Sequence, residues 1–195
     1  MKVTTIPGGS LGTNCYMAWN ENQDRCVLID PGFDPEKILE KVRAKDLTVE
    51  AILLTHGHFD HVGGVKQIAM ETDCKVFIHA GDLQLPSQLT LGVISYTDHY
   101  ENGDVLSMAG LEILVRHTPG HSPGSVCLIC ENVIFSGDTL FAGTCGRTDF
   151  PGGDYCKIHE SLKGLGAMEG QYHVLPGHGL PTTLERERRS NPYMQ

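Results

Sequence analysis

The feature that most constrains this chain is the segment Leu53–Gly64, which reads LLTHGHFDHVGG. It places three histidines and an aspartate within six residues, directly after an apolar run that predicts a buried strand. In an extended chain His56 and His58 point to the same side, and Asp60 continues that alternation. His61 can turn back into the same pocket from the start of a helix. The segment therefore predicts a cation site, with a polar surface loop as the alternative.

Three further candidate ligands follow apolar strands elsewhere in the chain. His121 lies in the Pro/Gly loop TPGHSPGSV, Asp138 ends the strand of FSGDTLF, and His178 follows the strand of VLPGHGLP. Open α/β sheets gather their active sites at the carboxyl ends of strands. A lone histidine in a loop is usually structural, but three such placements beside the first segment favour one shared metal site.

The pattern of apolar residues predicts short strands alternating with helices. CYMAW and CVLID read as a hairpin around NENQDR, and DPEKILEKVRAK as a helix with Asp34 as its cap and Pro35 in its first turn. Further strands are VEAILLT, KVFIHA, LEILVRHT, SVCLIC, VIFSGD and HVLP, and further helices are HVGGVKQIAME, DYCKIHESLKGLG and TTLERERRS, the last with Thr182 and Glu185 at capping-box spacing. Strands grouped in both halves predict one α/β domain over residues 1–195, a four-layer sandwich of two sheets between helices.

Charge and cysteine content narrow the function classes. A formal net charge of −9 argues against binding to nucleic acid or to an anionic membrane. No long apolar run and no apolar N-terminal segment are present, so we expect neither a membrane span nor a secretory signal. Seven scattered cysteines predict a reducing location, the cytoplasm. Cys127 and Cys130 lie three apart on a predicted strand and point to opposite faces, so they predict buried thiols.

These segments resemble the metallo-β-lactamase superfamily, whose signature is HxHxDH followed by distant His, Asp and His. The resemblance runs from LIDPG at Leu28–Gly32 to the final helix and implies an αββα sandwich. It implies a first metal site of His56, His58 and His121, a second of Asp60, His61 and His178, and Asp138 as the bridging carboxylate. It also implies that Asp30 is a structural aspartate beneath the site, and that Asp60 and Asp138 are catalytic.

The ligand types indicate the chemistry. Five imidazoles and two carboxylates without a thiolate suit two divalent ions, zinc first, with iron or manganese as alternatives. Two cations that share a water would lower its pKa from about 16 toward about 7. The resulting hydroxide could attack a carbonyl carbon, so no serine nucleophile is required.

A second resemblance narrows the reaction. The run Gly137–Asp154, together with LPGHGLPTT and ERERRSNP, is similar to the glyoxalase II-like branch, which includes hydroxyacylglutathione hydrolases and persulfide dioxygenases. It implies hydrolysis of S-D-lactoylglutathione or another small acyl-thioester. Arg147 is the candidate substrate-binding residue for an anionic group, and an ion pair with Asp149 or Asp154 is its alternative. Glyoxalase II enzymes carry a C-terminal helical domain that we expect to be absent here, so a thiol other than glutathione stays open.

Other functions remain as alternatives. The first is a mononuclear-iron persulfide dioxygenase, and the second is a metal-binding module without catalysis. β-Lactam hydrolysis and nucleic-acid processing are less favoured, because we expect no secretory signal and the chain is acidic. The expected partner is a small-molecule thioester, with no nucleic acid and no membrane, and the oligomeric state is left open. Cys145 is expected to be an incidental thiol near the mouth of the site.

Overall fold

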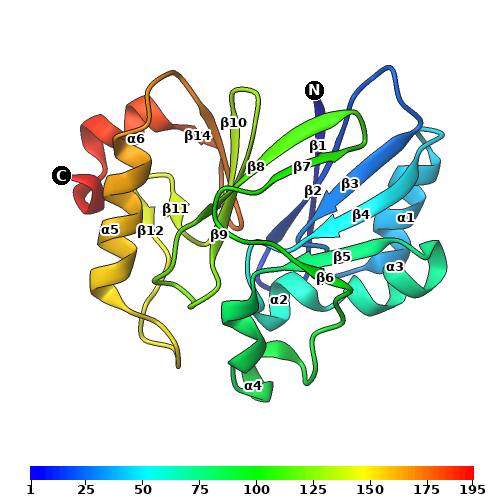
Figure 1. The fold of residues 1–195 in the computed structure, drawn as a ribbon, viewed down its shortest axis with the longest axis horizontal. Coiled ribbons are helices and arrows are strands. Elements are labelled where there is room, and N and C mark those ends of the chain that lie inside the picture. Colours follow the sequence, from blue (N-terminus) through cyan, green and yellow to red (C-terminus); the bar gives the residue numbers. More distant parts are fainter.

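The computed structural model describes residues 1–195, and its two large sheets pack face to face (Figure 1). The elements in chain order are β1 (Lys2–Gly8), β2 (Thr13–Trp19), β3 (Arg25–Ile29), α1 (Pro35–Arg43), β4 (Thr48–Leu53), α2 (Phe59–Val62), α3 (Val65–Thr72), β5 (Lys75–Ile78), η1 (Ala80–Gln84), α4 (Ser87–Thr90), β6 (Asp98–His99), β7 (Val105–Met108), β8 (Leu111–His117), β9 (Val126–Cys130), β10 (Val133–Gly137), β11 (Leu140–Phe141), β12 (Thr144–Cys145), α5 (Tyr155–Gly166), β13 (His173–Pro176), β14 (Thr182–Thr183), α6 (Leu184–Ser190) and η2 (Pro192–Met194).

Each sheet has six strands. The first has the order β1-β2-β3-β4-β5-β6 and the second the order β14-β13-β10-β9-β8-β7. Helices α1 and α3 lie outside the first sheet, and α5 and α6 lie outside the second (Figure 1). This arrangement confirms the four-layer αββα sandwich predicted from the sequence.

Three hydrophobic clusters fill the three spaces between the four layers. One joins the first sheet to α1 and α3, with Ile38 and Ile68 among its members, and one lies between the two sheets. The third joins the second sheet to α5 and α6. Cys127 belongs to this third cluster and Cys130 to the cluster between the sheets, so the two thiols do point to opposite faces of β9. Both are buried and free.

The predicted helix over HVGGVKQIAME is in fact two helices, α2 and α3, separated at Gly63 and Gly64. The break follows from close packing against the loop after β3. A Cβ at Gly63 would overlap the carbonyl oxygen of Gly32, and one at Gly64 would lie 2.7 Å from that of Pro31. The amide of Gly64 also donates to the Pro31 carbonyl at 2.8 Å. The helix is interrupted at Gly63 and Gly64, where its backbone packs directly against the backbone of Pro31 and Gly32.

Two predicted helix caps are wrong. Asp34 makes no capping hydrogen bond, because its backbone is left-handed (φ 49°) and an N-cap is normally extended. For α6 the cap is Thr183, which accepts from the Arg186 amide, and not Thr182. Thr182 instead donates to the buried carboxylate of Glu187 at 2.6 Å. By contrast, Asp154 caps α5 through the Lys157 amide.

The parallel strands point their carboxyl ends toward one edge of the sandwich. In the first sheet β3, β4 and β5 are parallel, and in the second β10 and β13 are parallel. The two sheets also touch at this edge, where the backbone amide of Asn14 donates to the Gly177 carbonyl at 2.7 Å. Loops that leave β3, β4, β10 and β13 therefore meet between the sheets.

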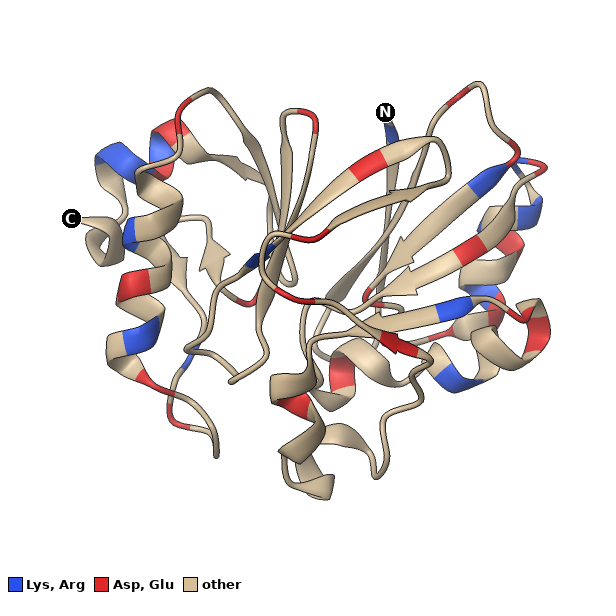
Figure 2. Cartoon of the chain, in the orientation of Figure 1, with Lys and Arg blue, Asp and Glu red and all other residues tan.

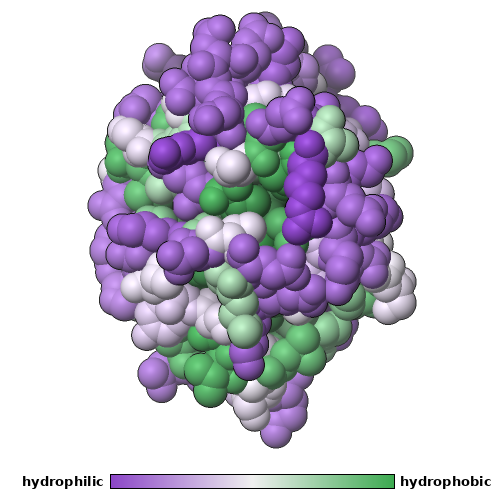
Figure 3. Space-filling model, turned by 90° about the vertical axis from the view of Figure 1, so that its right-hand side faces the viewer, coloured by the Kyte–Doolittle hydropathy of each residue, from purple (hydrophilic) through white to green (hydrophobic).

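Charged residues of both signs are spread over both halves of the molecule (Figure 2). Lys and Arg are spread over the outer helices and strands, among more numerous acidic residues (Figure 2). The face that carries α1 and α3 is mostly hydrophilic, with apolar atoms in a hollow and at its lower end, over α4 (Figure 3). Leu91 and Val93, which follow α4 in the chain, are exposed. None of the helices combines the length and apolar character that crossing a bilayer requires.

The loop after β3 gives a stability prediction. A Cβ at Gly32 would overlap the Asp60 carbonyl oxygen, whereas one at Gly166 meets only the flexible end of Met194 at 3.3 Å. We expect Gly32→Ala to lower the free energy of unfolding of the metal-free protein by more than about 2 kcal/mol, and Gly166→Ala to change it by less than about 1 kcal/mol. Urea unfolding followed by circular dichroism measures both, and equal effects would contradict the close approach.

Candidate metal centre

The segment that runs from the end of β4 through α2 carries four of the predicted ligands. His56 and His58 lie in the extended stretch after the strand, and Asp60 and His61 lie in the first turn of α2. The turn forms because the amide of His61 donates to the His58 carbonyl at 2.9 Å. All four side chains are buried, as the spacing of the segment predicts.

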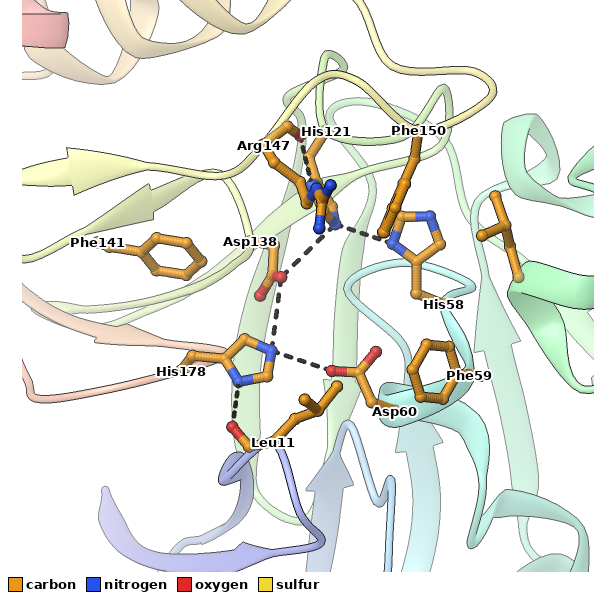
Figure 4. Close-up of a pocket in the computed structure, with 11 residues that line it drawn as sticks. Leu11, His58, Phe59, Asp60, His121, Asp138, Phe141, Arg147, Phe150 and His178 are labelled. Atoms are coloured by element: carbon orange, nitrogen blue, oxygen red, sulfur yellow. Dashed lines mark hydrogen bonds and ion pairs between the residues drawn. The ribbon is translucent and has the colours of Figure 1, made fainter.

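The structure brings all seven predicted ligands together. His56, His58 and His121 form one group, and Asp60, His61 and His178 form another, with the ligand atoms of each group within 4.8 Å of one another. Asp138 lies between the two groups (Figure 4). Its Oδ2 is 3.5 Å from His121 Nε2 and 3.6 Å from His178 Nε2, and its Oδ1 is 3.5 Å from His61 Nε2. This is the position that a bridging carboxylate requires.

Hydrogen bonds set the orientation of four imidazoles. In each of these rings Nδ1 lies within hydrogen-bonding distance of an oxygen, so that Nδ1 carries the proton and Nε2 presents a lone pair. The four acceptors are Thr55 Oγ1 for His56 (3.1 Å), Asp30 Oδ2 for His61 (3.0 Å), the Arg147 carbonyl for His121 (2.8 Å) and the Leu11 carbonyl for His178 (3.2 Å). His58 instead faces the centre with Nδ1, which lies 2.8 Å from His121 Nε2. Five nitrogen atoms therefore face the centre.

Asp30 supports this arrangement from beneath. It follows β3 in a left-handed conformation (φ 51°) that non-glycine residues adopt only when their surroundings hold them there. Its Oδ1 accepts from the Thr55 amide at 2.7 Å, and its Oδ2 accepts from Thr55 Oγ1 at 2.6 Å and from His61 at 3.0 Å. Since Thr55 Oγ1 in turn accepts from His56, one carboxylate orients imidazoles of both groups.

The electrostatics of the centre fit cations. Burial and the neighbouring histidines lower the pKa of His56, and burial and His121 lower the pKa of His58 to about 4. Both rings are then neutral at pH 7, as metal ligands must be. Burial alone would lower the pKa of His61, but Asp138 and Asp30 raise it to about 9. The carboxylates therefore favour positive charge at this place, which divalent ions would supply.

Three buried side-chain atoms of the predicted ligands have no hydrogen-bond partner within the protein: Nε2 of His56, Nε2 of His58 and Oδ1 of Asp138. His58 faces the centre with its other nitrogen, whereas His56 Nε2 and Asp138 Oδ1 face it directly. Buried polar atoms are normally hydrogen-bonded, so an unpaired lone pair aimed at the centre indicates a missing electrophilic partner. With five nitrogen atoms and two carboxylates at hand, the residues present fit two divalent ions of the zinc, iron or manganese type.

Asp82, at the centre of η1, is a residue that the sequence analysis missed. Its buried carboxylate accepts from the Gly57 amide at 2.7 Å, from Ser122 Oγ at 2.8 Å and from the Gly124 amide at 2.5 Å. Gly57 lies between His56 and His58, and Ser122 follows His121. Asp82 therefore joins the two loops that supply the first group of ligands. No motif singles out Asp82 in the sequence, and only these tertiary contacts reveal it.

A pocket of about 420 Å³ lies over the ligands (Figure 4). Its lining consists of Leu11, His58, Phe59, Asp60, Leu89, His121, Asp138, Phe141, Arg147, Phe150 and His178. Arg147 reaches this pocket, yet its guanidinium pairs with Asp149 through two bonds of 2.7 Å and stacks on the Phe150 ring. The ion pair that the sequence left open is thus present, and a contact with substrate stays a prediction. Cys145 is half-buried and does not line the pocket.

The chain is similar in sequence and in fold to several known proteins. A model described as the metallo-beta-lactamase superfamily matches residues 8–169. The hydroxyacylglutathione hydrolase GloC of Haemophilus influenzae is 32% identical over 100% of this chain and 98% of its own. The crystal structure of BLEG-1 B3 metallo-beta-lactamase has a TM-score of 0.90 and 35% identity, and covers 100% of both chains. That of TTHA1623 in a di-iron-bound form has a TM-score of 0.86 and 39% identity, and covers 97% of this chain and 99% of its own.

Metal stoichiometry tests the role of Asp138. We expect the protein to bind two divalent ions per chain and Asp138→Asn to retain at most one, because an amide cannot neutralise and bridge two cations. His99→Gln, a change at an exposed histidine outside the centre, is the control and should retain two. Elemental analysis after dialysis measures the ratio. Unchanged stoichiometry in Asp138→Asn, with native circular dichroism, would refute the bridge.

Asp82 gives a separate prediction about metal affinity. Asp82→Asn replaces one acceptor oxygen by an NH2 group that faces donors, so the loops of His58 and His121 should lose their fixed spacing. We expect zinc affinity to fall about 10–100-fold, as for other residues that orient metal ligands. Competition with a chromogenic chelator measures the affinity, and Asp98→Asn, at a partly exposed carboxylate far from these loops, is the control. An affinity within about twofold of the wild type would show that Asp82 has no such role.

Proposed function

Because this chain belongs to the metallo-beta-lactamase superfamily, we propose that it is a binuclear metal-dependent hydrolase of small acyl-thioesters. The main support is the convergence of all seven predicted ligands, of which His58, Asp60, His121, Asp138 and His178 line the pocket. The similarity to a relative named as a hydroxyacylglutathione hydrolase supports the thioester as the substrate class. S-D-lactoylglutathione is therefore the reference substrate.

The proposed reaction adds one water across a carbon–sulfur bond. The water oxygen bonds to the carbonyl carbon, the carbon–sulfur bond breaks, and the sulfur leaves as a thiol with one proton of the water. Two divalent ions bound at the centre would lower the pKa of a shared water and polarise the carbonyl. A thiolate leaves readily, so the reaction needs no dedicated general acid at the sulfur.

Within the chain we assign catalytic roles to two carboxylates, Asp60 and Asp138, which would balance the positive charge of the bound ions. Burial would raise the pKa of Asp60, but the hydrogen bond from His178 and the charge of His61 bring this pKa well below its usual range. Asp60 therefore stays ionised, and its Oδ2 also accepts from Thr13 at 3.2 Å. Asp138 Oδ1 has no hydrogen-bond partner in the protein and lies 3.5 Å from His61 Nε2, so it faces the centre.

The metal is the point on which a second function depends. We propose zinc, but the di-iron-bound form of a structure 39% identical to this chain favours iron as the alternative. With a single iron, the same centre would suit a persulfide dioxygenase. We place either activity in the cytoplasm, since all seven cysteines are free thiols and a reducing compartment preserves them.

Activity assays with defined metals test the proposal. Protein loaded with zinc or with iron is assayed with S-D-lactoylglutathione, with a chromogenic β-lactam, and with a persulfide under oxygen. We expect thioester cleavage at two ions per chain, and in Asp138→Asn a fall in kcat of more than about a hundredfold. His99→Gln should keep full activity, because this exposed residue lies outside the centre.

Two outcomes would overturn the thioesterase proposal. Oxygen consumption with the persulfide and no thioester cleavage, at one iron per chain, would identify the dioxygenase. Cleavage of the β-lactam alone would place the chain with the B3 enzyme that it resembles in structure. Elemental analysis of protein purified without added metal then gives the native ion.

A further inference from the structure

Apolar side chains form the walls of the pocket on both sides of the ligands. Phe141 lies on one side, and Phe59 and Phe150 lie on the other (Figure 4). The Phe150 ring packs edge-on against His58 with centroids 5.8 Å apart, and the Phe141 ring packs likewise against His178 at 6.2 Å. Each group of ligands therefore has its own aromatic wall.

These walls are not part of the protein core. Phe59, Phe141 and Phe150 are all only partly buried, and none belongs to the three core clusters. Leu89 from α4 and Leu11 add to the lining, and Leu11 is 53% exposed. Partly exposed apolar side chains around a concave site are the usual means by which a pocket binds the apolar parts of a ligand.

The pocket holds little positive charge for an anionic substrate. Arg147 is the only cationic side chain other than histidine in its lining. Its guanidinium already binds both carboxylate oxygens of Asp149, and this hydrogen bonding lowers the pKa of Asp149 to about 2, so the partner is always ionised. Asp30, Asp60 and Asp138 would offset three of the four positive charges that two divalent ions bring.

The whole chain has the same bias, with a formal net charge of −9. A thioester of glutathione carries two carboxylates and one ammonium group on its thiol arm, and thus a net negative charge. Such a substrate would meet a negatively charged protein on approach and, apart from the bound ions, no cationic side chain in the pocket that is free of an ion pair. A neutral thioester would meet neither penalty and would bury its apolar groups on the aromatic walls.

We infer that the substrate is a neutral thioester with an apolar acyl group and an uncharged, apolar thiol arm, which bind to the aromatic walls on either side of the carbonyl. The inference rests on the proposed function and narrows its substrate class. In this arrangement the carbonyl lies over the ligands, and the two arms of the substrate extend toward Phe141 and toward Phe150.

Two thioesters with the same acyl group test the effect of the charge on the thiol arm, because the bond that is cleaved is the same in both. S-butanoyl-N-acetylcysteamine is neutral and S-butanoylglutathione is anionic. With the zinc-loaded full chain we expect kcat/KM to be about tenfold or more higher for the neutral ester, mainly through KM. Raising the salt from about 0.05 M to about 0.5 M should increase kcat/KM for the glutathione ester and leave the neutral ester unchanged, because salt screens repulsion.

Variants of the walls and of the ion pair test the named contacts. Phe141→Ala and Phe150→Ala should each raise KM for the neutral ester about tenfold at unchanged metal content. Tyr155→Ala is the matched control, since this exposed aromatic residue lies outside the pocket. Asp149→Asn removes the partner of Arg147 and should lower KM for the glutathione ester several-fold, with no effect on the neutral ester.

The outcomes distinguish this inference from the proposed function. If neither ester is cleaved, the proposed function fails. If both are cleaved and the glutathione ester has the higher kcat/KM, the thioesterase stands and the neutral substrate is refuted. Equal effects of Asp149→Asn on both esters would refute the argument that Asp149 keeps Arg147 from binding an anionic thiol arm.

Discussion

The carboxylate of Asp30 is the interaction on which the site depends. It connects the end of β3 to the start of the loop after β4 through Thr55, and it orients His56 and His61 in the two groups of ligands. Its left-handed backbone is tolerated because these hydrogen bonds hold it in place. The same loop brings Gly32 against the carbonyl of Asp60, so the position of α2 is set by backbone contact as well as by hydrogen bonds. The groups beneath the centre are therefore positioned by contacts within the protein itself.

Placing five histidines and three carboxylates close together, most of them buried, is electrostatically unfavourable unless cations bind among them. Histidines that are buried beside one another resist protonation, and carboxylates that are buried together resist ionisation unless positive charge lies near. In the protein without metal, His56 and His58 are neutral because their pKa values are lowered. His61 holds a proton, because the carboxylates raise its pKa to about 9. The open pocket above is different in character, since aromatic side chains and a paired arginine line it.

Much of the fold and most of the site could be predicted from sequence because their signals are local. The apolar runs CYMAW and CVLID around a polar loop, the apolar runs before His56 and Asp138, and the tight spacing of the first four predicted ligands each depend on neighbours in the chain. The break at Gly63 and the role of Asp82 could not be predicted, because each depends on contacts with distant segments. The cap at Thr183 is local, but it could not be told from Thr182, because adjacent threonines offer the same hydroxyl. The same reason applies to Arg147: its place in the chain predicts a pocket residue, but only the structure shows its bidentate partner.

The division of the ligands between the two sheets has a consequence for how the centre forms during synthesis. The loop after β4 supplies four ligands from the first sheet, while His121, Asp138 and His178 come from the second. His178 follows His61 by 117 residues and is the last of the set to leave the ribosome. The second group of ligands is therefore complete only after both sheets have been made and have docked. Under the proposed function, two ions could therefore bind only to a chain whose two sheets have already docked.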